Sequence, residues 1–389
     1  MFNVTKIICG REQPMDALRY GEGREAPASA AARRPVVVWN VTRTCNLRCT
    51  HCYSDSAPEK YDELSFDEGR ALLDDLAAFG VPAVLLSGGE PLARRDTLEL
   101  AAYARSLGLK LTLSTNGTLV DEATARRIKD LGFTYVGISF DGLGATNDRF
   151  RGVAGAFERA LRAIRNLKAV GQKVGLRLTL TPNTVADLDG IFDFIESEQI
   201  QRACFYHLVP AGRGSSLVAL SHDDTRAALD RIFERTQALA RKGDPREILT
   251  VDNHADAAYA TMWLERTGAP HAESARAALA WNGGANHSSG IGIADIDWLG
   301  NVHPDQFLQN ITLGNVRERP FSEIWSDPEQ PVLSKLRRRR EFVGGRCRSC
   351  SFFATCGGNF RARAFGMTGD LWAEDPGCYL SDAEIAQTA

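Results

Sequence analysis

Three cysteines stand close together near the start of the chain, in the stretch TRTCNLRCTHCYSDS. Cys45, Cys49 and Cys52 have the spacing C-x3-C-x2-C. Thiolates bind zinc and iron–sulfur clusters, but a structural zinc site usually has four protein ligands and a [4Fe–4S] cluster usually has four thiolates. The spacing therefore predicts a metal site whose fourth ligand lies far away in the chain or is not protein.

Four more cysteines are clustered near the other end of the chain. They are Cys347, Cys350, Cys356 and Cys378. We read no signal peptide, and clustered thiols in a reducing compartment more often bind metal than form disulfides. These four are enough to complete a second metal site. The isolated Cys9 and Cys204 are interpreted as small, buried apolar side chains.

The elements that must position these cysteines alternate between β-branched runs and helical stretches. The predicted strands are 36–42, 83–87, 110–114, 134–139, 174–180 and 203–208. Ser65 and Glu68 form a capping box at the start of the first intervening helix. Six βα units in series predict a parallel sheet, either doubly wound or a barrel. The fold class that we predict is α/β, a partial (βα)6 TIM-like barrel with a small cysteine-rich C-terminal domain.

The chain divides into four predicted parts. Residues 1–34 form an N-terminal segment and linker, and residues 35–220 form the partial barrel. Residues 221–280 are predicted to be a helical connection. Residues 281–389, rich in Gly and Asn before the late cysteines, are predicted to be a smaller domain that begins with a β-hairpin.

Polar, glycine-rich stretches follow all six predicted strands. Ligands in parallel α/β sheets collect at the carboxyl ends of the strands. The residues at these ends are Gly88, Gly89, Glu90, Ser114, Asn116, Ser139, Arg177, His207 and Arg213. They share a face with the first three cysteines, so this face is predicted to be an active site.

Composition excludes several other classes of protein. The chain is 44% hydrophobic and 24% charged with a net charge of -3, which is typical of a globular protein and not of a nucleic-acid binder. The apolar runs are too short to span a bilayer. We therefore expect a cytoplasmic protein without a nucleic-acid or membrane partner.

The early motif resembles that of the radical S-adenosylmethionine (SAM) superfamily, because Tyr53 follows the last cysteine and GGEP follows one βα unit later. The resemblance implies that Cys45, Cys49 and Cys52 hold three irons of a [4Fe–4S] cluster and that SAM chelates the fourth. It also implies that Gly88, Gly89 and Glu90 receive the SAM amino group. Contacts with ribose, carboxylate and adenine are implied for Ser114, Asn116, Ser139, Arg177 and Tyr53.

The late motif resembles the SPASM extension of many radical SAM enzymes. That resemblance implies an auxiliary [4Fe–4S] cluster bound by Cys347, Cys350, Cys356 and Cys378, although a four-cysteine zinc site would use the same residues. A non-enzymatic iron–sulfur carrier is the alternative of another class, and it would not need the Gly-Gly-Glu motif.

Further stretches, including DALRYG and GDLWAEDPGCYLSDAEI, resemble the radical SAM enzymes of modified-tetrapyrrole synthesis. One branch removes acetate side chains from 12,18-didecarboxysiroheme to give iron-coproporphyrin III. The other removes propionates from the same substrate on the route to d1-type haem. The N-terminal stretch favours the first branch, and a peptide-modifying SPASM enzyme is the third alternative. An external electron donor of the ferredoxin or flavodoxin type is implied.

An iron tetrapyrrole requires cationic clamps and an apolar cleft. Arg213 is a candidate clamp for a substrate carboxylate. His207, His254 and His303 are candidate axial ligands of the iron.

Overall fold

The computed structural model describes residues 1–389 except 14–15, 17–19, 21–32, 283–287 and 387–389. One sheet runs through the described residues in the order β1-β8-β7-β6-β5-β4-β3-β2-β9-β10-β11. The strands are β1 (Phe2–Asn3), β2 (Val36–Asn40), β3 (Val84–Ser87), β4 (Leu111–Thr115), β5 (Tyr135–Ser139), β6 (Val174–Leu180), β7 (Arg202–His207), β8 (Glu247–Val251), β9 (Ile293–Ile296), β10 (Asn301–His303) and β11 (Gly314–Asn315).

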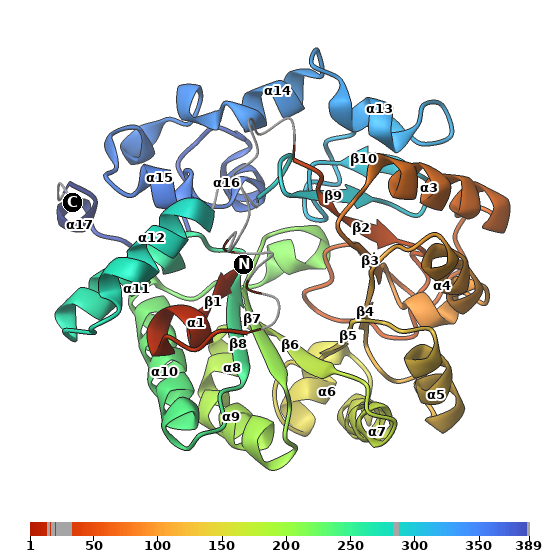
Figure 1. The fold of residues 1–389 in the computed structure, drawn as a ribbon, viewed down its shortest axis with the longest axis horizontal. Helices are drawn as coiled ribbons and strands as arrows, with labels where there is room; N and C mark the ends of the chain where they lie inside the picture. Colours follow the sequence, from red (N-terminus) through yellow and green to blue (C-terminus); the bar gives the residue numbers. More distant parts are fainter. Residues whose placement is uncertain (14–15, 17–19, 21–32, 283–287, 387–389) are drawn as a thin grey trace.

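Strands β2 to β8 pair in parallel, each with the next. All six predicted strands form, and the sheet curls while the helices lie outside it (Figure 1). This open, curled sheet confirms the predicted partial barrel. The helices between these strands are α3 (Phe66–Phe79), α4 (Thr97–Ser106), α5 (Glu122–Asp130), α6 (Ala145–Arg151), α7 (Ala156–Ala169), α8 (Pro182–Ala186), α9 (Leu188–Ser197) and α10 (His222–Arg241).

The start of α3 shows how local chemistry fixes an element boundary. The Ser65 side chain accepts a hydrogen bond from the Glu68 backbone N–H, and the Glu68 carboxylate accepts one from the Ser65 N–H. This is the capping box predicted from the sequence, and it satisfies two donors that a helix start leaves unpaired. A left-handed Gly80 ends the helix.

The segment predicted as a helical connection contains strand β8, so the prediction of helices alone for 221–280 was wrong. The run EILTV is completely buried and pairs in parallel with β7. A strand buried on both faces has no polar alternation, so its period does not distinguish it from a stretch of helix. The rest of this segment is helical as predicted and forms α11 (Ala255–Arg266) and α12 (Ala272–Asn282).

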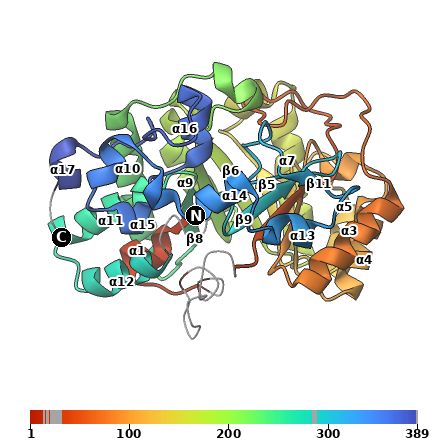
Figure 2. The same cartoon turned by 90° about the horizontal axis from the view of Figure 1, so that it is seen from above.

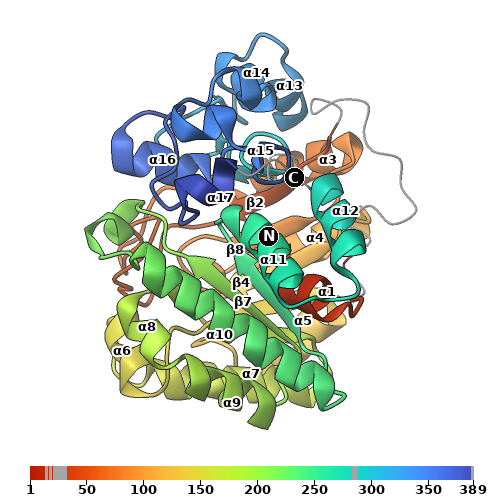
Figure 3. The same ribbon diagram turned by 90° about the vertical axis from the view of Figure 1, so that its left-hand side faces the viewer.

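The first residues of the chain belong to the barrel, although they were predicted to be a separate segment. Strand β1 pairs antiparallel with β8, and helix α1 (Val4–Cys9) packs beside α10. Figure 3 shows α1 beside α10 and α11. Most of the predicted linker, 22–34, lies outside the described residues.

The C-terminal region continues the sheet of the barrel. Strand β9 pairs in parallel with β2 and antiparallel with β10, which gives the predicted hairpin. Figure 2, which is seen from above, shows the C-terminal helices spread across the near side of the barrel. They are α13 (Phe321–Ser326), α14 (Pro331–Arg337), α15 (Phe353–Cys356), α16 (Arg361–Thr368) and α17 (Asp382–Ala386). No helix in the described ranges is long and apolar enough to cross a membrane.

Candidate active site

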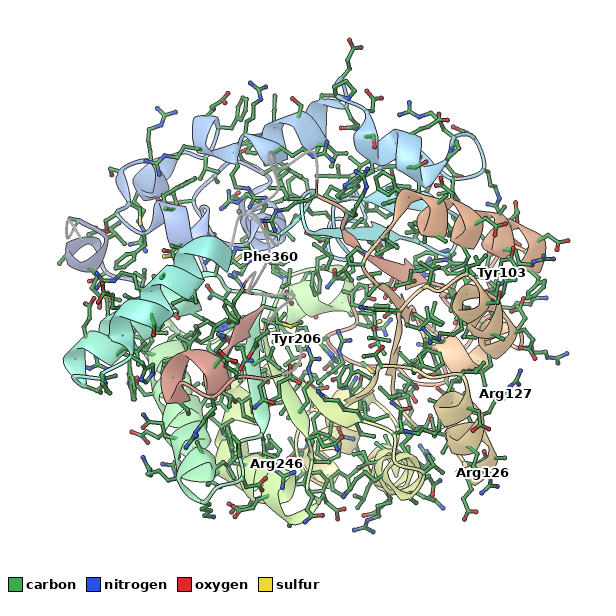
Figure 4. The ribbon with its side chains drawn as sticks, viewed as in Figure 1. Tyr103, Arg126, Arg127, Tyr206, Arg246 and Phe360 are labelled. Atoms are coloured by element: carbon green, nitrogen blue, oxygen red, sulfur yellow. The ribbon has the colours of Figure 1, made fainter. Side chains whose placement is uncertain are left out.

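The carboxyl ends of the parallel strands surround a cavity inside the barrel. Its lining includes five of the residues predicted from strand ends and motifs, which are Tyr53, Ser114, Ser139, Arg177 and His207. Tyr206, which precedes His207 on β7, lies near the middle of the ring of elements, whereas Arg126 and Arg127 lie outside on α5 (Figure 4). The geometry therefore brings predicted residues from β4, β5, β6 and β7 to one cavity.

The first three cysteines lie in the loop after β2, beside this cavity. Cys45, Cys49 and Cys52 pack with one another and with Leu47. The Leu47 N–H donates to the Cys45 sulfur at 3.4 Å, and the Ser56 N–H donates to the Cys52 sulfur at 3.3 Å. Hydrogen bonds of this kind stabilise thiolates and tune the potential of an iron–sulfur cluster.

Burial makes the thiols of Cys45 and Cys49 poor anions unless a cation compensates the charge. Burial, followed by the Glu90 carboxylate, raises the pKa of Cys45 to about 12. Burial also raises the pKa of Cys49, although the Arg151 guanidinium opposes the shift. Thiolates bind metal and thiols do not. Binding of iron would therefore supply the positive charge that lets these buried thiols lose their protons. Three gathered sulfurs with N–H donors fit the predicted three-cysteine cluster.

The Gly-Gly-Glu motif packs against the backbone of the cysteine loop. A Cβ on Gly88 would lie 2.3 Å from the Thr42 carbonyl oxygen, and one on Gly89 would lie 2.4 Å from that of Thr44. The N–H groups of Gly89 and Glu90 donate to these same two carbonyls. The glycines are therefore required for the close approach of the loop that carries the cysteines.

Glu90 is fully buried, and its carboxylate joins the end of β3 to the end of β4. It accepts from the Thr115 hydroxyl at 2.7 Å, the Asn116 N–H at 2.7 Å and the Leu92 N–H at 3.1 Å. Both oxygens accept hydrogen bonds within the protein, but three bonds do not use all the lone pairs of a carboxylate, and the contact implied between Glu90 and the SAM amino group stays a prediction. Burial raises the pKa of Glu90 despite these donors.

Asn116 lies beside the cysteine loop. Its side-chain amide donates to Asn46 at 2.9 Å and approaches the Cys45 sulfur at 3.9 Å. Its side-chain carbonyl accepts from Thr118. The ribose contact implied for Ser114 and Asn116 stays a prediction, and of the two only Ser114 is among the cavity-lining residues.

Arg177 and Tyr53 give the cavity its charge and its aromatic wall. The guanidinium of Arg177 lies 4.9 Å from the centre of the Tyr206 ring, and no carboxylate among the described residues pairs with it. The Tyr53 hydroxyl donates to the Asn40 side chain at 2.8 Å, and the ring packs edge-on against Phe307. A free cation beside a stacking surface fits the carboxylate and adenine of SAM.

Arg213 does not point into the cavity as a clamp for substrate. Its guanidinium donates to the Cys49 carbonyl at 2.9 Å, the Ser56 carbonyl at 2.9 Å and the Asp55 carboxylate at 2.7 Å. The prediction of a substrate clamp was wrong, because Nε and both terminal nitrogens of Arg213 already donate to these three acceptors. Arg213 instead fastens the cysteine loop to the end of β7.

The three histidines proposed as axial ligands have different surroundings. Both ring nitrogens of His303 are engaged, Nδ1 with the Ile311 carbonyl and Nε2 with Asp297. His254 is buried against Phe360, and burial lowers its pKa well below the usual value. His207 alone of the three lines the central cavity.

Several cavity residues were not predicted from the sequence. Arg151 on α6 pairs with buried Asp141 and donates to the Cys49 sulfur at 3.5 Å. Asp252 lines the cavity after β8 with a left-handed φ of 67°, and its Oδ2 is buried without a hydrogen-bond partner. Strained, unpaired polar residues mark functional sites. Recognition of β8 as a strand would have identified Asp252 by the strand-end rule.

Phe307 brings the C-terminal region into the same cavity. It lies in the loop after β10, and its ring centre is 5.3 Å from that of Tyr53 and 5.8 Å from that of Phe360. Figure 4 places Phe360 between the C-terminal elements and the barrel. Gln306 also lines the cavity, and its buried side-chain oxygen has no partner.

The late cysteines gather in a second group. Burial raises the pKa of Cys356, and the thiols of Cys378, Cys347 and Cys350 raise it further. Burial raises the pKa of Cys347 to about 11. The other three thiols lie near enough to Cys356 to raise its pKa, and Arg346 holds the Cys378 carbonyl at 3.0 Å. The donor set fits a closed four-thiolate site. Within the described ranges, no three His, Cys, Asp or Glu side chains converge on a position for a single metal ion.

Two family models match the chain. The radical SAM superfamily matches residues 39–195, and an iron–sulfur cluster-binding domain, SPASM, matches residues 290–351. The SPASM match includes Cys347 and Cys350 and ends before Cys356. Together these matches confirm the predicted cofactors, which are SAM and two iron–sulfur clusters.

Solved structures agree on the fold. A Streptococcus suis SuiB structure bound to S-adenosylmethionine has a TM-score of 0.70 at 19% identity, covering 89% of this chain and 78% of that one. An anSMEcpe structure with bound AdoMet has a TM-score of 0.69 at 20% identity, covering 89% and 94%.

Relatives in sequence are much closer. The chain is 48% identical to the Fe-coproporphyrin III synthase of Methanosarcina barkeri over 99% of both chains. It is 46% identical to the pre-heme d1 synthase of Dinoroseobacter shibae over 90% of this chain and 87% of that one. It is 34% identical to an AdoMet-dependent heme synthase of Nitratidesulfovibrio vulgaris over 88% and 91%. The chain therefore belongs to the radical SAM superfamily, in the group of haem-synthesis enzymes that carry a SPASM domain.

Proposed function

We propose that the chain removes the two acetate side chains of 12,18-didecarboxysiroheme to give iron-coproporphyrin III. The observation that carries this proposal is the 48% identity to an Fe-coproporphyrin III synthase along 99% of both chains. The N-terminal residues contribute to this end-to-end match, and here they form β1 and α1 at the edge of the barrel.

The residues of the cavity have distinct tasks in this proposal. Cys45, Cys49 and Cys52 would hold the first cluster, and Arg177 and Tyr53 would receive SAM. When bound, the cluster and SAM together would supply a 5′-deoxyadenosyl radical that takes a hydrogen atom from the substrate. A carbon–carbon bond to the side chain would then break. The protein orients the substrate and excludes water.

The C-terminal region has two tasks. Cys347, Cys350, Cys356 and Cys378 would hold the auxiliary cluster. Phe307 and Gln306 reach the cavity from this region and close one of its sides. We propose the barrel of 35–220 and the cysteine-rich region of 281–389 as the two functional domains, with an external ferredoxin or flavodoxin as electron donor.

The second candidate function is pre-haem d1 synthesis, in which propionates of the same substrate are altered. The 46% identity to a pre-heme d1 synthase supports it, over 90% of this chain. The shorter coverage makes it the weaker candidate.

The proposal is tested by measuring the product released from the acetate side chains of the tetrapyrrole. The chain is reconstituted anaerobically with iron and sulfide and incubated with SAM, dithionite and 12,18-didecarboxysiroheme. We expect 5′-deoxyadenosine and two equivalents of an acetate-derived product for each tetrapyrrole converted. Formation of 5′-deoxyadenosine with altered propionates and no acetate-derived product would favour the second candidate, and no 5′-deoxyadenosine at all would contradict both.

A further inference from the structure

His207 is oriented by a buried carboxylate. Its Nε2 lies 2.9 Å from Oδ2 of Asp256, which is fully buried at the start of α11. The other oxygen of Asp256 accepts a hydrogen bond of 2.8 Å from the Tyr379 hydroxyl in the C-terminal region. A carboxylate accepts and does not donate, so the imidazole proton is on Nε2 and the lone pair is on Nδ1.

The second ring nitrogen of His207 has no partner in the part of the chain that the structure describes. The residue lines the central cavity and also a second cavity outside β7, which His222, Arg363 and Met367 line as well. A histidine that donates one N–H to a carboxylate and keeps its other nitrogen free has the arrangement of a metal ligand, because the carboxylate fixes the ring and raises its basicity.

The other described histidines near the site lack one of these features. His303 uses both nitrogens within the protein. His51 lines the cavity, but its Nε2 lies 3.9 Å from the Asp141 carboxylate, too far for a hydrogen bond, and its ring packs on Phe150 at 4.5 Å. His254 is not among the residues that line either cavity.

Apolar side chains stand beside His207 in the lining of the central cavity. Leu208 and Val209 follow it in the chain, and both line the central cavity together with Phe307. Apolar side chains around a histidine ligand exclude water from an iron centre and leave the axial bond to set the position of the ring.

We infer that Nδ1 of His207 is the axial ligand to the iron of the tetrapyrrole, with Asp256 as its positioning residue. This inference rests on the proposed function. The bond fixes the centre of the macrocycle relative to the cysteine loop, so that side chains at its edge are presented to the SAM site.

The test uses the reconstituted full chain and ferric iron-coproporphyrin III, with metal-free coproporphyrin III as a second probe. Binding is measured by titration, and the iron–histidine stretching band is read by resonance Raman after reduction. We expect this band in the wild-type protein and in His222→Ala, a control at the outer cavity. His207→Ala should lose the band and bind the iron probe about tenfold more weakly, with unchanged binding of the metal-free probe, and added imidazole should restore the band.

Asp256→Asn provides a second variant, because asparagine can still accept from Tyr379. With its oxygen bonded to Tyr379, the asparagine presents its NH2 group to Nε2 of His207, so the ring proton moves to Nδ1. The variant should therefore lose most of the band and bind the iron probe more weakly, with unchanged binding of the metal-free probe. A band that persists unchanged in His207→Ala, or its absence from wild-type protein that binds both probes equally, would overturn the inference. Failure of the wild-type protein to bind either probe would instead count against the proposed function.

Discussion

At the scale of single residues, the cavity combines free charges with tightly bonded ones. Arg177 and Oδ2 of Asp252 face the cavity without a hydrogen-bond partner among the described residues, whereas Glu90 is bonded at the ends of β3 and β4 and Arg213 is bonded to the loop that carries the cysteines. Unpaired buried groups are costly and are kept where a ligand completes them. Arg177 and Asp252 therefore serve ligands, whereas Arg213 holds the cysteine loop in shape.

Asp252 should give the stability of the chain a pH dependence. Burial, with a smaller contribution from Asp305, raises the pKa of Asp252 to about 7 against the opposing charges of the amino terminus, Arg363 and Arg177. The usual value is about 3.9. The folded chain therefore keeps a proton that the unfolded chain releases, so this contribution is present below about pH 4 and is lost as pH rises through about 7. Relative to wild type, Asp252→Asn should be more stable at pH 8 than at pH 5.

Denaturant unfolding at the two pH values measures this effect, and Asp62→Asn, on an exposed loop, is the control. An equal difference from wild type at pH 5 and pH 8 would show that Asp252 does not titrate in this range.

Arg213 should act on the cysteine loop and not on substrate. Arg213→Ala removes three hydrogen bonds to the loop, each worth about 1 kcal/mol. We expect reconstituted iron to fall from about eight toward about four atoms per chain as the first cluster is lost. Arg231→Ala, which removes exposed ion pairs on α10, should leave the iron content unchanged. Full iron content with weaker substrate binding would restore the clamp interpretation.

At the scale of elements, the loop after β2 is held by its neighbours. The turn after β3 donates two backbone hydrogen bonds to it, and helix α6 supplies Arg151. The strand-end rule correctly predicted that β2 to β7 would present polar residues to one face. It could not predict Arg151 or Phe307, because a helix and a distant loop bring them there only after folding.

Gly89 should tolerate no side chain. In Gly89→Ala the new Cβ would lie 2.4 Å from the Thr44 carbonyl oxygen, so the loop has to move. The first cluster should be lost while the auxiliary cluster is retained, which gives about four irons per chain. In Gly344→Ala the nearest atom is 3.8 Å away, and this variant should keep about eight. Iron analysis with EPR distinguishes the two variants, and a fully loaded Gly89→Ala would contradict the close packing.

At the scale of the whole molecule, the sheet joins the two groups of cysteines into one framework. Strand β9 of the C-terminal region pairs with β2, whose end carries the first group, and one apolar core extends from the barrel to Trp325 and Tyr379. The sequence was sufficient to predict the barrel, both groups of cysteines and the hairpin. It did not reveal β8 or the saturation of Arg213, since an apolar run has no distinctive period and a side chain's partners depend on packing.

The auxiliary site should be separable from the first. Cys347→Ala removes one of four thiolates, and iron should fall from about eight to about four per chain. Cys9→Ala, away from both groups, should retain about eight. Unchanged iron together with bound zinc in the wild-type chain would contradict a second iron–sulfur cluster.

The central claim is that this chain converts didecarboxysiroheme by removal of acetates. The most direct measurement is the mass of the tetrapyrrole isolated after anaerobic incubation of the reconstituted chain with 12,18-didecarboxysiroheme, SAM and reductant. We expect a product that has lost both acetate side chains and matches authentic iron-coproporphyrin III. A product with both acetates intact, or unchanged substrate while 5′-deoxyadenosine accumulates, would contradict it.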